Sequence, residues 1–241
     1  MLKLFLSILL IFQGSLFGHC DGCDVQKKHT HGTLKGNVKY KGKVPQAKTL
    51  KMDADPVCGS SHEGKVLTES FIVDDDMNFK NVLVWLKNVK YDGSPSQAEI
   101  AVLDQKGCVY SPHIFPVMKG QKVLIKNSDA TLHNIHSMAK VNDQFNFAMP
   151  KVVKEQETTF DQVEEPFYIK CDVHPWMKSW VLVQDHPFFA VTDDKGNFSI
   201  NNIPPGTYEV IAWQEKFKMK RALIKTVEIK DVGETVQDFL F

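Results

Sequence analysis

Four residues in the second half of the chain have the types and the spacing of metal ligands. Cys171, His174 and Met177 follow one another as Cys-x2-His-x2-Met, and His133 lies upstream of them. Two imidazoles, a thiolate and a thioether form a ligand set that suits copper in both of its common oxidation states. Zinc also binds histidine and cysteine, but its sites rarely use methionine, so Met177 favours copper.

Strand-like segments precede both parts of this ligand set. The run PFYIKCDVH places Cys171 directly after apolar residues, and the run QKVLIKNSD comes before His133. Three ligands from one short loop define three corners of a site, and a histidine from a neighbouring strand supplies the fourth. The pattern therefore predicts a site between two strands and a loop.

The rest of the chain, from Leu34 onward, alternates short apolar runs with turn-forming residues. Val, Ile, Tyr, Phe and Trp dominate the runs, and Gly, Asp, Asn and Pro separate them. This pattern is typical of strands joined by turns. No long segment has a convincing helical period, so the expected fold class is all-β, a sandwich or a barrel.

The segment from about Ala98 to Asp185 resembles a cupredoxin of the plastocyanin and amicyanin kind. The resemblance rests on the Cys-x2-His-x2-Met loop and on residues 133–136, His-Asn-Ile-His, which are similar to the His-Asn-Val signature of that family. It implies a Greek-key β-barrel that binds one type 1 (blue) copper ion. The ligands that match position for position are His133, Cys171, His174 and Met177.

The same resemblance implies roles for residues beside the ligands. The family often has Ser or Thr after the ligand cysteine, bonded toward the Asn beside the first histidine, whereas this chain has Asp172. Its carboxylate could accept a hydrogen bond from Asn134, and its charge is expected to lower the reduction potential. In the family the C-terminal histidine ligand reaches the surface in an apolar patch, which places the expected electron port at His174, Pro175 and Trp176. The alternative is that Trp176 fills the seam between two β domains.

Residues 185–241 resemble the small transthyretin-like or carboxypeptidase-regulatory β-sandwich. They contain T-D-x-x-G-x-F at 192–198 and P-P-G-x-Y at 204–208. Such modules usually open with a strand of the type G-x-V-x-Y-x-G, which occurs here far upstream, at 36–42. We expect residues 34–184 to form the copper domain. The strand at 36–42 supports an alternative, in which residues 34–90 pair with the C-terminal sandwich around an inserted middle domain.

The cysteine count separates one thiol from the others. There are five cysteines, an odd number, so at least one stays outside intramolecular disulfides in an oxidising compartment. Cys58 and Cys108 lie in loop-like sequence and form the expected disulfide, and Cys171 is left for the metal. Cys20 and Cys23 lie in a polar leader, residues 19–33, that we expect to be flexible. An accessory copper site formed by Cys20, Cys23, His29 and His31 is the alternative.

The first 18 residues have the charged start and short apolar run of a secretory signal peptide. No other stretch approaches the roughly 20 apolar residues of a membrane span, so the mature chain is expected to lack one. The sequence predicts a secreted or periplasmic protein. An uncleaved anchor and a lipid-modified Cys20 are the alternatives.

Charge and motif content limit the function. Basic and acidic residues balance at 29 each, which argues against nucleic acid as a partner. No second histidine cluster provides a catalytic copper centre, and no small-molecule substrate is evident, so the chain is not expected to be an enzyme. The prediction is a carrier of single electrons between transient redox protein partners. The alternatives are a periplasmic copper carrier or storage protein, and a metal-free β-sandwich binding module.

Overall fold

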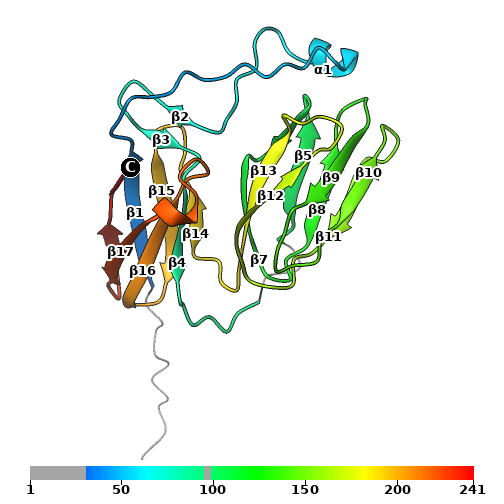
Figure 1. The fold of residues 1–241 in the computed structure, drawn as a ribbon. Coiled ribbons are helices and arrows are strands. Elements are labelled where there is room, and N and C mark those ends of the chain that lie inside the picture. Colours follow the sequence, from blue (N-terminus) through cyan, green and yellow to red (C-terminus); the bar gives the residue numbers. More distant parts are fainter. Residues whose placement is uncertain (1–30, 95–98) are drawn as a thin grey trace, which may run out of the picture.

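The computed structural model describes residues 31–94 and 99–241, and these ranges form an all-β protein, as predicted (Figure 1). Two β units lie side by side. The outer unit is built from both ends of the described chain, and the inserted unit from its middle. The predicted signal peptide, Cys20 and Cys23 lie outside the described residues.

The outer unit contains two four-stranded sheets and a small hairpin. One sheet has the order β15-β1-β18, with β19 also paired to β1, and the other has the order β14-β4-β16-β17. The hairpin pairs β2 with β3. The strands are β1 (Gly32–Lys39), β2 (Ile72–Val73), β3 (Phe79–Lys80), β4 (Leu83–Lys87), β14 (Phe189–Val191), β15 (Asn197–Ile203), β16 (Gly206–Trp213), β17 (Leu223–Ile229), β18 (Glu234–Val236) and β19 (Phe239–Leu240), with a 3-10 helix at Met219–Arg221.

The strand partners of β1 and β4 correct the expectation that residues 34–184 form the copper domain. They agree with the alternative, in which residues 34–90 pair with the C-terminal sandwich. β1 pairs with β15, β18 and β19, and β4 pairs with β14 and β16. Strands upstream of residue 90 thus share sheets with the C-terminal strands and not with the middle of the chain. The leader boundary also moves, because Gly32 and Thr33 already belong to β1.

The inserted unit contains two further sheets that enclose a core of their own. Their orders are β10-β9-β12-β13-β7 and β11-β8-β5-β6. These sheets stay open in the described residues, so the closed barrel implied by the resemblance is replaced by a two-sheet sandwich. The strands are β5 (Ala101–Lys106), β6 (Val109–Ser111), β7 (Ile114–Met118), β8 (Val123–Asn127), β9 (His133–Ser137), β10 (Asn146–Met149), β11 (Glu155–Thr158), β12 (Glu164–Lys170) and β13 (Lys178–Gln184).

Burial along the strands explains how the two units meet. In a strand with one face toward solvent, buried residues alternate with more exposed ones. β8 follows this pattern, and its buried residues are Val123, Ile125 and Asn127. In contrast, four consecutive residues of β4 are buried, because Val84 and Leu86 face the outer unit's core while Leu83 and Trp85 face the junction.

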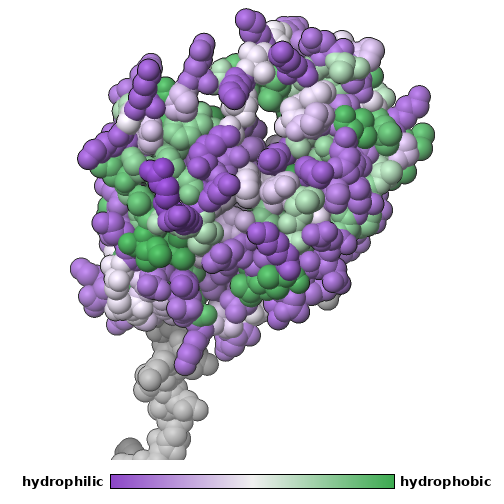
Figure 2. Space-filling view, in the orientation of Figure 1, coloured by the Kyte–Doolittle hydropathy of each residue, from purple (hydrophilic) through white to green (hydrophobic). Residues whose placement is uncertain are grey.

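β13 and β16 are buried on both faces in the same way. Leu182 of β13 meets Ile211 and Trp213 of β16 in the junction cluster, with Ile114 of β7 beside them. The molecule is therefore a stack of sheets with apolar layers between them. The face of the molecule in Figure 2 is mostly hydrophilic, with separate hydrophobic patches.

An arm, residues 41–70, leaves the outer unit after β1 and reaches across to the inserted unit (Figure 1). It carries the only α-helix of the described ranges, α1 (Pro56–Ser60), which Asp55 caps by accepting a hydrogen bond from the Val57 N–H at 2.8 Å. The predicted disulfide between Cys58 and Cys108 ties α1 to the turn between β5 and β6. A covalent bond thus holds the arm over one end of the inserted unit.

Within the described residues, no helix is both long and apolar enough to cross a bilayer.

Candidate metal centre

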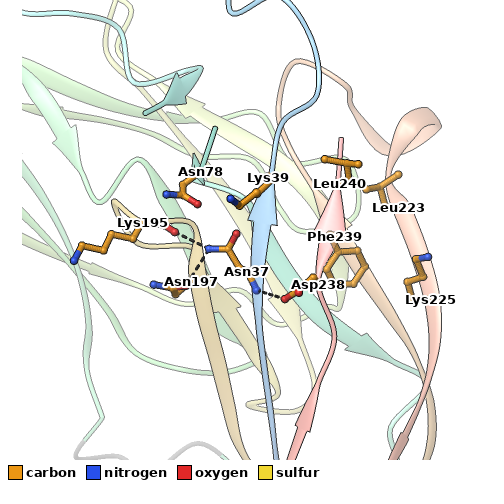
Figure 3. Close-up of a pocket in the computed structure, with 10 residues that line it drawn as sticks. All are labelled: Asn37, Lys39, Asn78, Lys195, Asn197, Leu223, Lys225, Asp238, Phe239 and Leu240. Atoms are coloured by element: carbon orange, nitrogen blue, oxygen red, sulfur yellow. Dashed lines mark hydrogen bonds between the residues drawn. The ribbon is translucent and has the colours of Figure 1, made fainter. Parts of the chain in front are cut away.

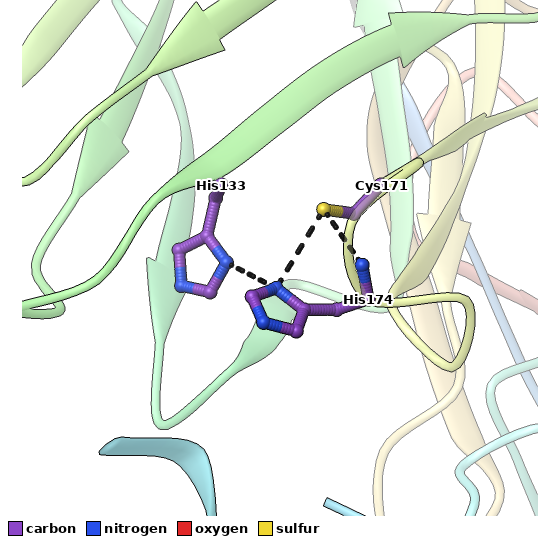
Figure 4. Close-up of side chains that lie close together, drawn as sticks. All are labelled: His133, Cys171 and His174. Carbon is purple, nitrogen blue, oxygen red and sulfur yellow. Dashed lines mark hydrogen bonds between the residues drawn. The ribbon is translucent and has the colours of Figure 1, made fainter. Parts of the chain in front are cut away.

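Three of the four predicted ligands converge at the end of the inserted unit that the arm covers (Figure 4). His133 is the first residue of β9, Cys171 directly follows β12, and His174 lies in the loop that leads to β13. His133 Nδ1 is 2.9 Å from His174 Nδ1, and Cys171 Sγ is 3.8 Å from the latter atom. Strands that neighbour each other in the sheet, β9 and β12, thus bring distant parts of the sequence together.

Backbone hydrogen bonds give the ligand loop its shape. The backbone N–H of His174 points at Cys171 Sγ at 3.3 Å, and the Met177 N–H donates to the His174 carbonyl at 2.9 Å. The N–H of Cys171 donates to the Met177 carbonyl at 3.3 Å, which closes the loop. Met177 is buried, at 1% exposure, in the core of the inserted unit.

Two carboxylates decide which nitrogen of each imidazole faces the centre. Asp129 Oδ2 lies 2.9 Å from His133 Nε2, and Asp55 Oδ2 lies 3.1 Å from His174 Nε2. An ionised carboxylate only accepts hydrogen bonds, so each Nε2 carries a proton and the Nδ1 atoms face each other across the centre. A ring without a second proton presents the lone pair of its Nδ1 there. Partners of this kind fix the orientation of metal-binding histidines and raise their basicity.

The two Nδ1 atoms and the Cys171 sulfur are electron-rich and lie close together, so a positive charge between them stabilises the cluster. Burial lowers the pKa of His133, but the Asp129 carboxylate and the Cys171 sulfur outweigh it and raise that pKa to about 9. Burial also raises the pKa of Cys171, yet the hydrogen bond with His133 and nearby backbone N–H groups lower it overall. Burial holds the pKa of His174 below its usual value. The cluster thus favours a thiolate and one shared positive charge.

A metal ion bound by the two imidazoles and the thiolate would also supply this positive charge. Two nitrogens bound at about 2.0 Å to one tetrahedral ion lie about 3.3 Å apart, and a nitrogen and a thiolate sulfur somewhat further. The observed separations, 2.9 Å and 3.8 Å, are close to that geometry. A buried site of two imidazoles and a thiolate fits a soft or borderline transition metal and not the hard ions magnesium or calcium.

Asn134 links the two ligand segments. Its Oδ1 accepts a hydrogen bond from the backbone N–H of Asp172 at 2.6 Å and lies 3.2 Å from Cys171 Sγ. Its Nδ2 donates to the Asp172 carboxylate at 3.2 Å, the contact expected from the sequence. The strand of the first histidine is thereby held against the cysteine.

Neighbouring side chains compensate the negative charge of Asp172. Lys170 Nζ lies 2.7 Å and His136 Nδ1 2.9 Å from its carboxylate oxygens. The hydrogen bond from Lys170 in particular holds the pKa of Asp172 far below its usual value. Because a cation compensates this carboxylate, its effect on the reduction potential is expected to be smaller than its charge alone suggests.

The arm changes the predicted electron port. His174 is only 2% exposed, whereas the resemblance implies that it reaches the surface. The cause is the arm: Asp55 occupies the outer nitrogen of the ring and is itself held by the Thr131 hydroxyl at 2.8 Å. Pro175 is exposed and Trp176 is half-buried, so these two residues of the predicted port remain accessible.

Asp55 and Asp129 are the residues at this centre to which the sequence analysis gave no role at the metal. Asp129 follows β8 in an Asn-Ser-Asp turn, four residues before His133, and that proximity is a usable signal. Asp55 has no such signal, because 119 positions separate it from His174 and no local pattern marks the arm as its neighbour.

A hollow of about 800 Å³ lies on the outer unit, away from the candidate metal centre (Figure 3). Asn37 lies in it, where its side-chain amide donates to the Lys195 carbonyl at 2.7 Å and to Asn197 Oδ1 at 3.0 Å. These bonds join β1 to the turn before β15 and to the first residue of β15. The hollow contains none of the predicted ligands and is a feature of the outer unit's fold.

Comparisons with known proteins give limited matches. Residues 168–237 match the family described as polysaccharide lyase family 4, domain II, which is less than half of the chain. No curated protein matches.

Three solved structures that resemble part of the chain are a nitrite reductase, a purple cupredoxin and an amicyanin variant. A copper-containing nitrite reductase from Thermus scotoductus SA-01 is 16% identical, with 41% of this chain and 25% of that chain covered and a TM-score of 0.34. A purple cupredoxin from Nitrosopumilus maritimus is 24% identical (35% and 99% covered, TM-score 0.30). An amicyanin variant in its Cu(I) form is 22% identical (42% and 98% covered, TM-score 0.32). The chain spans about a quarter of the nitrite reductase.

Proposed function

We propose that this chain is an exported copper protein that carries single electrons. The observation that carries the proposal is the convergence of His133 Nδ1, His174 Nδ1 and Cys171 Sγ within 4.8 Å of one another in a buried site. Copper bound there would supply one-electron chemistry, by alternating between its +2 and +1 states. The signal-like N-terminus of the sequence supports export.

The residues around the centre are arranged to hold its geometry unchanged. Asp129 and Asp55 fix the two rings, Asn134 fixes the position of Cys171, and the disulfide holds the arm. A rigid ligand set that suits both oxidation states needs little rearrangement when an electron arrives or leaves. We assign Met177 as the fourth, weak ligand, on its position in the loop and its burial.

The test is the spectrum of the Cu(II)-loaded protein. Wild type is expected to show an intense visible thiolate-to-copper band and narrow copper hyperfine splitting in electron spin resonance. Cys171→Ser and His133→Ala should lose this band. His136→Ala serves as the matched control, because His136 lies on the same strand but faces Asp172, and it should keep the band.

Two results would contradict the proposal. A visible band that survives in Cys171→Ser would show that another sulfur binds the metal. A protein that binds Cu(I) without colour and does not form a stable Cu(II) complex would favour the copper carrier, and one that binds no copper would favour the metal-free module.

A further inference from the structure

The imidazole of His174 is shielded from any partner protein. Asp55 covers its outer nitrogen, and Cys58 Sγ lies 3.7 Å from the same atom. Both residues belong to the arm, which the disulfide to Cys108 holds in place. An electron that enters through this ligand must therefore come by way of a neighbouring group that does reach solvent.

Trp176 is that neighbour. Its ring centroid is 5.1 Å from that of His174, and its Nε1 donates a hydrogen bond to the Cys108 carbonyl at 2.9 Å. The hydrogen bond fixes the ring against His174, while Trp176 is only half-buried and lines a surface groove. An aromatic ring in this position shortens the gap between a docked partner and the metal centre.

The exposed part of Trp176 lies in a groove of about 600 Å³ between the ligand loop and the arm. Pro175 and Leu50 contribute apolar surface, and Phe71 lies at the base of the arm. The groove therefore combines rings and apolar side chains next to the metal centre, within reach of solvent.

The charged side chains that line the groove are all positive. Lys48 and Lys51 of the arm and Lys216 of the outer unit line it, all three are exposed, and no acidic residue is among the residues that line it. Because the whole chain has equal numbers of acidic and basic residues, this is a local concentration of positive charge and not a reflection of the overall balance. A patch of one sign beside a site accelerates encounters with partners of the opposite sign.

We propose that this groove is the docking site of an acidic redox protein, which exchanges one electron with the metal centre across Trp176. The inference rests on the proposed electron-transfer function and names its partner class and its port. No bond forms or breaks in the exchange: the partner loses one electron and the metal centre gains it, or the reverse. Small, transient contacts of this kind suit redox encounters.

The experiment measures stopped-flow rates of the copper-loaded protein with two small probes. Hexacyanoferrate(III), an anion, stands for the acidic partner, and it oxidises the Cu(I) protein while it is reduced to hexacyanoferrate(II). Hexaammineruthenium(II), a cation, reduces the Cu(II) protein. The reaction of the anion is expected to slow as salt is added, whereas that of the cation is not.

The groove variant changes Lys48, Lys51 and Lys216 to Glu, and the control variant changes Lys90, Lys119 and Lys230, three exposed lysines away from the groove, to Glu. Both variants have the same net charge. At low salt the groove variant should react about tenfold more slowly with hexacyanoferrate(III), and the control less than about twofold. Added poly-glutamate should slow wild type and not the groove variant. Equal rates in the two variants would overturn the docking site.

Trp176 is tested separately. Trp176→Ala should slow both probes with an unchanged visible band, and Trp176→Phe, which keeps a ring, should restore most of the rate. If the band is present and Trp176→Ala reacts as fast as wild type, the port is wrong while the copper site stands. If wild type has no band, the proposed function itself fails.

Discussion

Asp55 Oδ2 lies 3.1 Å from Nε2 of His174, although the two residues are 119 positions apart and Asp55 belongs to the arm. Through this contact the arm completes the candidate metal site in the inserted unit. It shields the imidazole edge and fixes the ring's tautomer with one carboxylate. Both effects depend on the position of the arm, which the disulfide sets.

Removing the carboxylate of Asp55 should weaken copper binding. Asp55→Asn is expected to lower Cu(I) affinity about 10- to 100-fold, the usual cost of losing a partner of a ligand histidine. Competition with a Cu(I)-specific chelator measures it. The control is Asp53→Asn, an exposed carboxylate on the same arm. Equal affinities for wild type and Asp55→Asn would mean that the contact does not position the ligand.

The same variant should raise the reduction potential. A carboxylate close to the metal stabilises the +2 state more than the +1 state, so its neutralisation favours Cu(I). Asp172→Asn should change the potential less, because Lys170 and His136 already balance that charge. Spectroelectrochemical titration of the three proteins measures the order. A larger shift in Asp172→Asn than in Asp55→Asn would contradict it.

Breaking the disulfide should destabilise the protein. Cys58 and Cys108 are separated by 50 positions, and a bridge that closes a loop of this size contributes about 4 kcal/mol in the chain-entropy model. Urea unfolding of the oxidised and reduced wild type, both free of metal, measures the difference. A reduced protein that unfolds at the same urea concentration would show that the arm's contacts alone hold it.

Stability at low pH should depend on Glu164. Burial raises its pKa, but the backbone N–H groups of Asn142 and Lys140 outweigh it and hold that pKa below the ordinary 4.5. A lowered folded pKa means that the carboxylate stabilises the protein above about pH 4.5 and loses this contribution as the pH falls further. Wild type should therefore exceed Glu164→Gln in stability at pH 7, and the gap should narrow toward pH 3. Glu165→Gln, at an exposed neighbour, should show no such gap.

The junction between the units should respond to a cavity. Ile211 of β16 is 3% exposed in the junction cluster, whereas its cross-strand partner Ile224 on β17 is 54% exposed. Ile211→Ala should reduce the free energy of unfolding by about 2–5 kcal/mol. Ile224→Ala should change it by less than about 0.5 kcal/mol. Similar losses in both variants would mean that the junction is not packed as the structure has it.

Local sequence determined the ligand loop and the character of the strands. Cys171, His174 and Met177 are close enough in the chain that their spacing alone limits how they can be arranged, and the alternation of apolar residues indicates strands wherever one face is wet. His133 could be added because a recognisable pattern surrounds it. The disulfide followed from the cysteine count and from the loop-like surroundings of Cys58 and Cys108.

Tertiary structure decided which strands share a sheet and what covers the metal centre. β1 pairs with strands near the other end of the chain, and Asp55 of the arm reaches His174 of the inserted unit. Such contacts depend on how whole sheets stack, since a strand's own residues encode which face is buried but not which partner buries it. The choice of candidate ligands therefore follows from short sequence segments, whereas the shielding of His174 and the partial exposure of Trp176 are properties of the complete fold.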